Sequence, residues 1–239
     1  MSNLSLYKSR SFQEIFADTG AFLQQEWRSF FLCIVFYAAP VAAVANYFNT
    51  RVKNPFDFES KEMLTFLVFA VVSNFLLQSV SYCYMACYAQ SGSSPSRHNV
   101  WDYFSKNIFT CLKAFFLSNA IIGLGLLLFV VPGMIALLPF SLYAVDTIFT
   151  ASPSRESLTR SVTLTQHSMG MGYATVLLCY AIIFALQITA GVAVGKASSG
   201  VQVLVTTALS IVSTVMYIVI AILYCSLSSK TQKTYDDNQ

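Results

Sequence analysis

The chain has 239 residues, of which 56% are hydrophobic and 10% are charged, whereas roughly a quarter of the residues in a soluble domain carry a charge. So little charge excludes a surface that lies wholly in water. The net charge of +3 is small and forms no concentrated basic face, which excludes nucleic acid as a partner.

Residues 1–28 form a polar and amphipathic start. They contain no short apolar core with a small-residue cleavage site, so we expect no cleavable signal peptide. From residue 12, apolar side chains recur every three or four positions and polar side chains take the other face. The apolar set is Phe12, Ile15, Phe16, Thr19, Phe22, Leu23, Trp27 and Phe30. This pattern predicts a cytoplasmic amphipathic helix in the headgroup plane of a membrane.

Six apolar runs follow, and each has about the length of a membrane span. A spanning helix takes about 20 mostly apolar residues, and only a helix satisfies its backbone hydrogen bonds within one such segment. The runs cover about residues 29–49, 63–89, 110–131, 132–149, 172–196 and 201–228. We therefore predict an all-α, polytopic integral membrane protein with six transmembrane helices in residues 29–228 and a cytoplasmic polar tail in residues 229–239.

Prolines predict one turn and two kinks. The third and fourth runs are separated only by Val131-Pro132-Gly133. Pro132 fits the first turn of a new helix, because its missing N–H would be unpaired there anyway. This indicates a tight hairpin. Pro40 and Pro139 lie inside runs and are expected to kink the first and fourth spans.

Lysine and arginine residues predict the orientation, because the side of the membrane richer in positive charge normally faces the cytoplasm. With the N-terminus inside, all but four of the 14 basic residues fall in the inner segments. The four outer ones are Arg51, Lys53, Lys61 and Lys196. An odd number of spans would place Lys230 and Lys233 outside and weaken this bias. We expect a multi-pass protein of the bacterial cytoplasmic (inner) membrane with both termini in the cytoplasm.

A second short amphipathic helix is expected before the third span. Asn99 is a good N-cap with Asp102 three residues later. The same helix would place Trp101, Phe104 and Ile108 on one side.

A third amphipathic helix is expected from Ser152-Pro153 to about residue 168. Leu158 and Val162 would form its narrow apolar face, and Glu156 could pair with Arg160 at i, i+4. Each of the three amphipathic helices precedes two spans. The chain is thus expected to consist of three hairpins, each preceded by a cytoplasmic interfacial helix.

Three stretches of this sequence resemble a known family. They are Val131-Pro132-Gly133, the end of the fourth run at Ala144-Val145-Asp146, and Ser157-Leu158-Thr159-Arg160-Ser161. They are similar to a six-helix bacterial membrane protein family related to the membrane domain of glycerophosphodiester phosphodiesterase. The resemblance implies a six-helix membrane domain. It implies no hydrolase activity, because no phosphodiesterase domain follows residue 228.

The residues needed for membrane-embedded hydrolysis do not come together in the sequence. Such chemistry needs a nucleophile with a base, or a metal with its ligands. The two histidines, His98 and His167, lie in cytoplasmic connections, and the six cysteines show no metal-ligand spacing. We expect no catalytic residue, no metal, no cofactor and no enzymatic activity.

Asp146 is the one ionisable residue that the sequence places inside a span, near its cytoplasmic end. Such residues are costly in a bilayer and are therefore functional suspects. One hypothesis is a carboxylate that couples transport to a proton or a substrate. The favoured hypothesis is a structural carboxylate that pairs with Arg155 or Arg160.

Neutral polar residues and two glycines complete the set of candidates inside the spans. The polar residues are Asn46, Asn74, Gln78, Asn119 and Gln187. Such side chains bond across helices or line a hydrophilic path. Gly191 and Gly195 form a GxxxG pair, which allows close helix approach and is expected to serve packing within the bundle.

Two functions follow from these patterns. The first is a non-enzymatic membrane protein that organises or supports envelope components or lipid homeostasis. The alternative is a transporter or lipid-handling protein with a polar cavity that involves Asp146. Membrane lipids are the expected partners in both cases, and other membrane proteins are further candidates. A polar, water-accessible cavity around Asp146 would favour the alternative.

Overall fold

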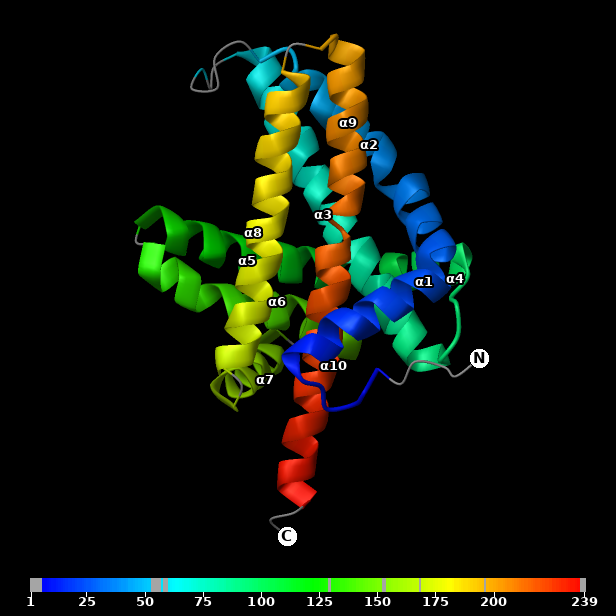
Figure 1. Ribbon diagram of the computed structural model, residues 1–239, viewed down its shortest axis with the longest axis vertical. Coiled ribbons are helices and arrows are strands. Elements are labelled where there is room, and N and C mark those ends of the chain that lie inside the picture. The colour runs from blue at the N-terminus through cyan, green and yellow to red at the C-terminus, as the bar shows by residue number, and fades with distance from the viewer. Residues whose placement is uncertain are drawn as a thin grey trace.

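The computed structural model describes residues 6–52, 57, 60–128, 130–151, 154–167, 169–195 and 197–236. Helix makes up 89% of the structure, and the described residues form no strand (Figure 1). The helices are α1 Phe12–Tyr37, α2 Ala39–Asn49, α3 Lys61–Ser91, α4 Arg97–Lys106, α5 Ile108–Leu128, α6 Val130–Thr150, α7 Ser154–His167, α8 Met169–Val194, α9 Ser199–Val212 and α10 Val215–Asp236.

Helices long and apolar enough to cross a membrane dominate the chain. Among the described residues, five elements meet this description, and a sixth is added if α1 and α2 count as one bent span. Helices α9 and α10 together form one of the five, through Lys230. The prediction of an all-α protein with the apolar helices of a multi-pass membrane protein is confirmed at this level.

Two directions of helix can be distinguished in Figure 1. Helices α2, α3, α8 and α9 run along the long axis of the molecule, and α10 continues α9 downward. Helix α1 and the pair α5 and α6 run across this axis. Helix α7, the end of α3 and the start of α1 lie in the lower half of the molecule, and α10 ends at the bottom, whereas α4 lies at mid-height beside α1.

Helix α1 begins with the signals expected of a helix start. Ser11 and Glu14 form a capping box, in which each side chain accepts a hydrogen bond from the other's backbone N–H. The helix then continues through residue 28, where the sequence predicted a change from interfacial helix to span. The break comes at Ala38, because Pro40 cannot continue the helix and disfavours helical backbone just before it. Helices α1 and α2 meet there at 56°, which confirms the kink expected at Pro40.

The second and third amphipathic helices differ in detail from their predictions. Helix α4 starts earlier than expected, because the Ser96 side chain, rather than Asn99, caps it by accepting from the Asn99 backbone N–H. Ile108 belongs to α5. In α7, Leu158 is half-buried and Val162 is 39% exposed, so the predicted apolar face is not the one that packs on the protein, and its contact with the membrane stays a prediction.

Helix α7 instead buries a mostly hydroxyl-bearing face. The buried residues are Ser157, Ser161, Leu164 and Thr165. This choice is set by what α7 packs against, which is the polar end of α6 described below. The expected start at Ser152-Pro153 lies outside the described residues.

Helices α5 and α6 pack side by side from their base to their tip. At Gly133 an added Cβ would lie 2.4 Å from the backbone nitrogen of Leu126, so only glycine allows this approach. We call these two helices the α5–α6 hairpin.

Pro132 is the third residue of α6, within its first turn as predicted, whereas Pro139 lies inside a helix that continues through it.

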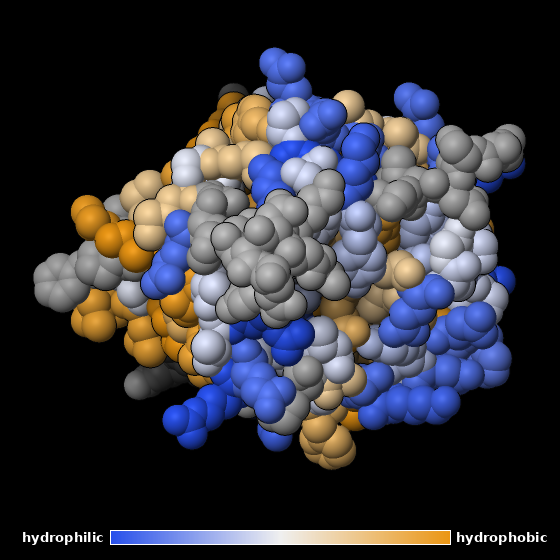
Figure 2. Space-filling view, turned by 90° about the horizontal axis from the view of Figure 1, so that it is seen from below, coloured by the Kyte–Doolittle hydropathy of each residue, from blue (hydrophilic) through white to orange (hydrophobic). Residues whose placement is uncertain are grey.

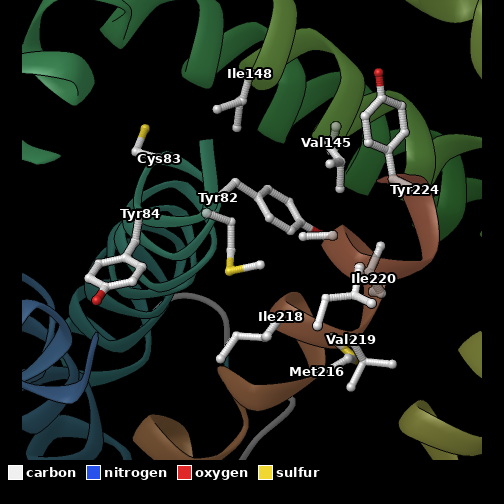
Figure 3. Close-up of a cluster of buried hydrophobic side chains, with 14 of the residues drawn as sticks. Tyr82, Cys83, Tyr84, Val145, Ile148, Met216, Ile218, Val219, Ile220 and Tyr224 are labelled. Atoms are coloured by element: carbon white, nitrogen blue, oxygen red, sulfur yellow. The ribbon is translucent and has the colours of Figure 1, made fainter. Parts of the chain in front are cut away.

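The core lies where α3, α6 and α10 meet (Figure 3). Tyr82 and Tyr84 come from α3, Val145 and Ile148 from α6, and Ile220 from α10. All five side chains are at most 1% exposed. The core is therefore formed jointly by α3 and α10, which follow the long axis, and by the crosswise helix α6.

Candidate functional site

Asp146 joins three helices at the lower end of the core. It has 0% exposure, and its Oδ1 atom accepts a hydrogen bond of 2.5 Å from the hydroxyl of Tyr224 on α10. The same Oδ1 lies 3.5 Å from Nε of Arg160 on α7. Of the two arginines considered in the sequence, the structure therefore brings Arg160 to the carboxylate. Arg155 is exposed at the surface.

Further buried oxygen atoms on the same three helices have no protein partner. Within the described part of the chain, these atoms are Asp146 Oδ2, Tyr143 Oη, Thr147 Oγ1, Ser157 Oγ and Ser228 Oγ. A buried polar atom without a partner costs about 1–3 kcal/mol unless water satisfies it. This polar junction of α6, α7 and α10 is therefore a costly feature within an apolar chain.

The segment that precedes α1 is hydrogen-bonded to α10 beside the polar junction. The backbone N–H of Arg10 donates to Ser226 Oγ on α10 at 2.9 Å. The guanidinium of Arg10, only 2% exposed as a residue, pairs with Asp18 at 2.6 Å. Burial, the Cys225 thiol and the Asp146 carboxylate raise the pKa of Tyr7 to about 12. The start of the chain therefore packs near Asp146, which the sequence did not predict.

Gln78 and Asn119 meet between α3 and α5. Asn119 Nδ2 donates to Gln78 Oε1 at 3.2 Å and to the Phe115 carbonyl at 2.9 Å. They share a small polar cavity of about 30 Å³ with Tyr82, Ser118, Ile122, Ser141, Tyr180, Tyr217 and Ile220. This volume suits one water molecule. Asp146 is not part of its lining.

The other polar candidates are not brought to this cavity. Asn74 is exposed and donates to the Ala70 carbonyl one turn earlier in its own helix. Gln187 is exposed on α8. Asn46 bonds across α2 and α9 to Thr207 Oγ1 at 3.1 Å. The polar residues of the spans therefore do not line one common path.

The GxxxG pair does not pack within the bundle as expected. A Cβ added to Gly191 would meet no described atom within 4 Å, and one added to Gly195 would meet only carbonyl oxygens of its own helix. Both glycines are exposed. Small size permits close approach here, but no neighbouring helix among the described residues makes it.

An apolar groove lies between the upright helices and α1. Its volume is about 350 Å³. Its lining consists of Phe16, Thr19, Gly20, Leu23, Cys179, Ile182, Ile183, Leu186, Leu209, Val212, Ser213, Val215, Met216 and Val219. Four helices contribute: α1, α8, α9 and α10. The sequence did not predict this groove, because its residues resemble those of any apolar run.

Comparison with protein-family models, with curated proteins and with solved structures finds no match to this chain. Three features of the molecule itself bear on its function: the polar junction, the small polar cavity and the apolar groove.

Proposed function

We propose that this chain is a non-enzymatic multi-pass membrane protein of lipid homeostasis that holds an acyl chain of a membrane lipid in the apolar groove. The apolar groove is the observation that carries this proposal. Its walls offer hydrocarbon almost everywhere, with Thr19 and Ser213 as the hydroxyl-bearing exceptions. The Thr19 hydroxyl is occupied, since it donates to the Ile15 carbonyl.

An acyl chain suits the groove for a reason that differs from binding in water. In a bilayer the hydrophobic effect does not favour the transfer of a lipid tail into the groove, because the surrounding lipid tails are as apolar as the groove. Instead, the side chains that line an unfilled gap between helices lose van der Waals contacts, and a molecule that fills the gap restores them. Water is excluded by the apolar walls, so a lipid tail is the available filler. A volume of about 350 Å³ lies at the lower end of ordinary ligand sites.

We place the protein in the bacterial inner membrane with both termini in the cytoplasm. The excess of basic residues on that side supports this orientation. The position of α7, the start of α1 and the end of α10 in the lower half of Figure 1 is compatible with it. A hydrophilic surface gathers on that end, as the view from below shows (Figure 2).

The transporter hypothesis has less support. It required a polar cavity around Asp146, but Asp146 is fully buried and lines neither the small polar cavity nor the apolar groove. Its Oδ1 atom is engaged by Tyr224 and Arg160. A structural carboxylate fits this geometry better than one that must exchange a proton or an ion with water.

Lipid retention tests the proposal. Gly20 lines the apolar groove, and a Cβ added there would meet nothing within 4 Å, so Gly20→Phe can fill the groove without a backbone clash. Gly123→Phe on α5 is the matched control, because its site is equally open and lies outside the groove.

The full chain is reconstituted with phosphatidylethanolamine and phosphatidylglycerol, extracted into detergent and analysed by native mass spectrometry. We expect Gly20→Phe to lower the retained phospholipid about tenfold, which corresponds to about 1.4 kcal/mol. The control should retain as much as the wild type. Equal retention by both variants and the wild type would remove the basis of the proposal.

A further inference from the structure

The α5–α6 hairpin does not run in the direction of the other membrane-length helices. In Figure 1 it projects sideways from the bundle, across α8 and at the level of its lower half. Helices α8 and α9 stand upright beside it. A flat bilayer that α8 and α9 cross along their axes would therefore contain this hairpin lengthwise in its plane.

The composition of the hairpin requires a hydrocarbon environment. No charged residue occurs between Lys113 and Asp146. A helix that lies at the membrane surface has one polar face, whereas a helix that is apolar all round is buried. Residues 119–136 are apolar apart from Asn119, whose amide is bonded to Gln78.

Only the base of the hairpin is covered by the rest of the protein. The buried residues of α5 all belong to its first half, from Cys111 to Ser118, and those of α6 are concentrated in its second half. The outer half exposes large apolar side chains, including Leu127 at 80% and Val131 at 66%. Orange side chains gather accordingly at the left edge of Figure 2, on the side where the hairpin projects in Figure 1.

We propose that the α5–α6 hairpin lies parallel to the membrane plane inside the hydrocarbon of one leaflet, surrounded by acyl chains, and acts as a wedge in that leaflet. The leaflet is the one on the side of α7 and the end of α10. Both helices satisfy their own backbone hydrogen bonds, so the hairpin can lie in hydrocarbon without crossing it. Its volume displaces lipid from one leaflet only, which makes the site sensitive to membrane curvature.

The distribution of basic residues fits this arrangement as well as it fits six spans. The turn between α5 and α6 carries no lysine or arginine, so moving it from the outer side into the membrane leaves the charge asymmetry unchanged. Four crossings, by the α1–α2 pair, α3, α8 and α9–α10, still return both termini to one side. The charge asymmetry is therefore the same in both arrangements, whereas the depth of the hairpin in the membrane differs between them.

Depth measurements on the reconstituted full chain test the inference. Single cysteines carrying a fluorophore replace Phe116 and Leu127 on α5, or Leu178 and Ile188 on α8, which are exposed positions outside the apolar groove. The background lacks the native cysteines and must keep the helical circular dichroism and melting temperature of the wild type. Each pair spans about 15–17 Å of helix axis. Quenching by lipids brominated at different acyl carbons reports the depth of each label.

We expect the two α5 labels to be quenched best by the same brominated lipid, and the two α8 labels by different ones. A depth difference on α5 as large as that on α8 would mean that the hairpin spans the membrane. Absence of quenching on α5 by any brominated lipid would mean that protein covers it. Either result overturns the inference without touching the acyl-chain proposal, which concerns other helices.

An accessibility experiment gives an independent answer. In the same background, cysteine at Val131 should resist a membrane-impermeant maleimide from both sides of the vesicle. Ser198 and Ser93, both exposed and placed at opposite ends of the upright helices, serve as controls that react from one side each. Reaction at residue 131 from the same side as residue 198 would restore the six-span arrangement and overturn the wedge.

Discussion

Asp146 illustrates what a carboxylate requires inside an apolar bundle. It has no exposed surface, and an uncompensated charge in such a place is strongly destabilising. Tyr224 and Arg160 supply a hydroxyl and a positive charge to the same Oδ1 atom. Because these partners come from α10 and α7, the carboxylate ties both helices to α6.

Removal of the tyrosine hydroxyl tests this role. We expect Tyr224→Phe to lower the free energy of unfolding by about 2 kcal/mol, since hydrogen bonds to charged groups contribute about 1.5–3 kcal/mol. The measurement is thermal unfolding in detergent. In a double-mutant cycle, Arg160→Gln should show coupling with Asp146→Asn, because the two side chains share one interaction.

Tyr143→Phe is the matched control. The Tyr143 hydroxyl is buried on α6 but has no partner among the described residues, so its removal should leave stability unchanged or raise it. If Tyr224→Phe unfolds at the wild-type temperature and the cycle shows no coupling, Asp146 is not held by these contacts.

Sequence reasoning found part of this site. Asp146 could be identified because it is the one acid in an apolar run, and Arg160 because it lies on the next helix. Tyr224 could not, since it lies 78 residues away in a run that also contains Tyr217. The pairing of Gln78 with Asn119, 41 residues apart, could not be predicted either. The sequence shows that both side chains are polar, but which helix faces meet depends on tertiary packing.

At the scale of elements, local sequence signals predicted which segments are helical better than they predicted where each helix ends or which of its faces is buried. Pro40 marked the break between α1 and α2 because a proline acts through its own backbone. The polar residues near Glu26 suggested an earlier change, but Glu26 is buried and accepts hydrogen bonds from Tyr84 and Ser94. A charged residue with such partners does not interrupt a helix. Its partners on α3 and in the following loop could not be read from the sequence of α1.

The closure of the α5–α6 hairpin depends on Gly133. A methyl group there would lie 2.4 Å from the Leu126 nitrogen, and backbone atoms cannot turn aside as a side chain can. We expect Gly133→Ala to separate the two helices and to lower stability by about 1–3 kcal/mol, as overpacking does elsewhere. Thermal unfolding in detergent measures this loss.

Gly123→Ala provides the comparison on the same hairpin. A Cβ at Gly123 meets nothing within 4 Å, and alanine favours helix by about 1 kcal/mol over glycine, so this variant should be as stable as the wild type or more stable. Equal behaviour of the two alanine variants would contradict the close approach of α5 and α6.

For the whole molecule, composition predicted the class and left the arrangement open. An apolar chain with little charge had to be helical in lipid, and the helices are present. Helices α3, α6 and α10 pack around a common set of buried side chains, and the directions of the helices depend on such tertiary packing. Spacing along the chain does not contain that information, which is why neither the crosswise hairpin nor the apolar groove could be foreseen.

The central claim is that the apolar groove holds an acyl chain, and photo-crosslinking tests it most directly. A phospholipid with a diazirine near the end of one acyl chain is mixed into vesicles that contain the full chain. After irradiation, peptides that carry the lipid are mapped by mass spectrometry. We predict that groove residues such as Leu23, Leu186 and Met216 carry more adducts than their exposed surface alone would give. We also predict that these adducts are lost in Gly20→Phe. Adducts distributed in proportion to exposure, and unchanged in Gly20→Phe, would contradict the claim.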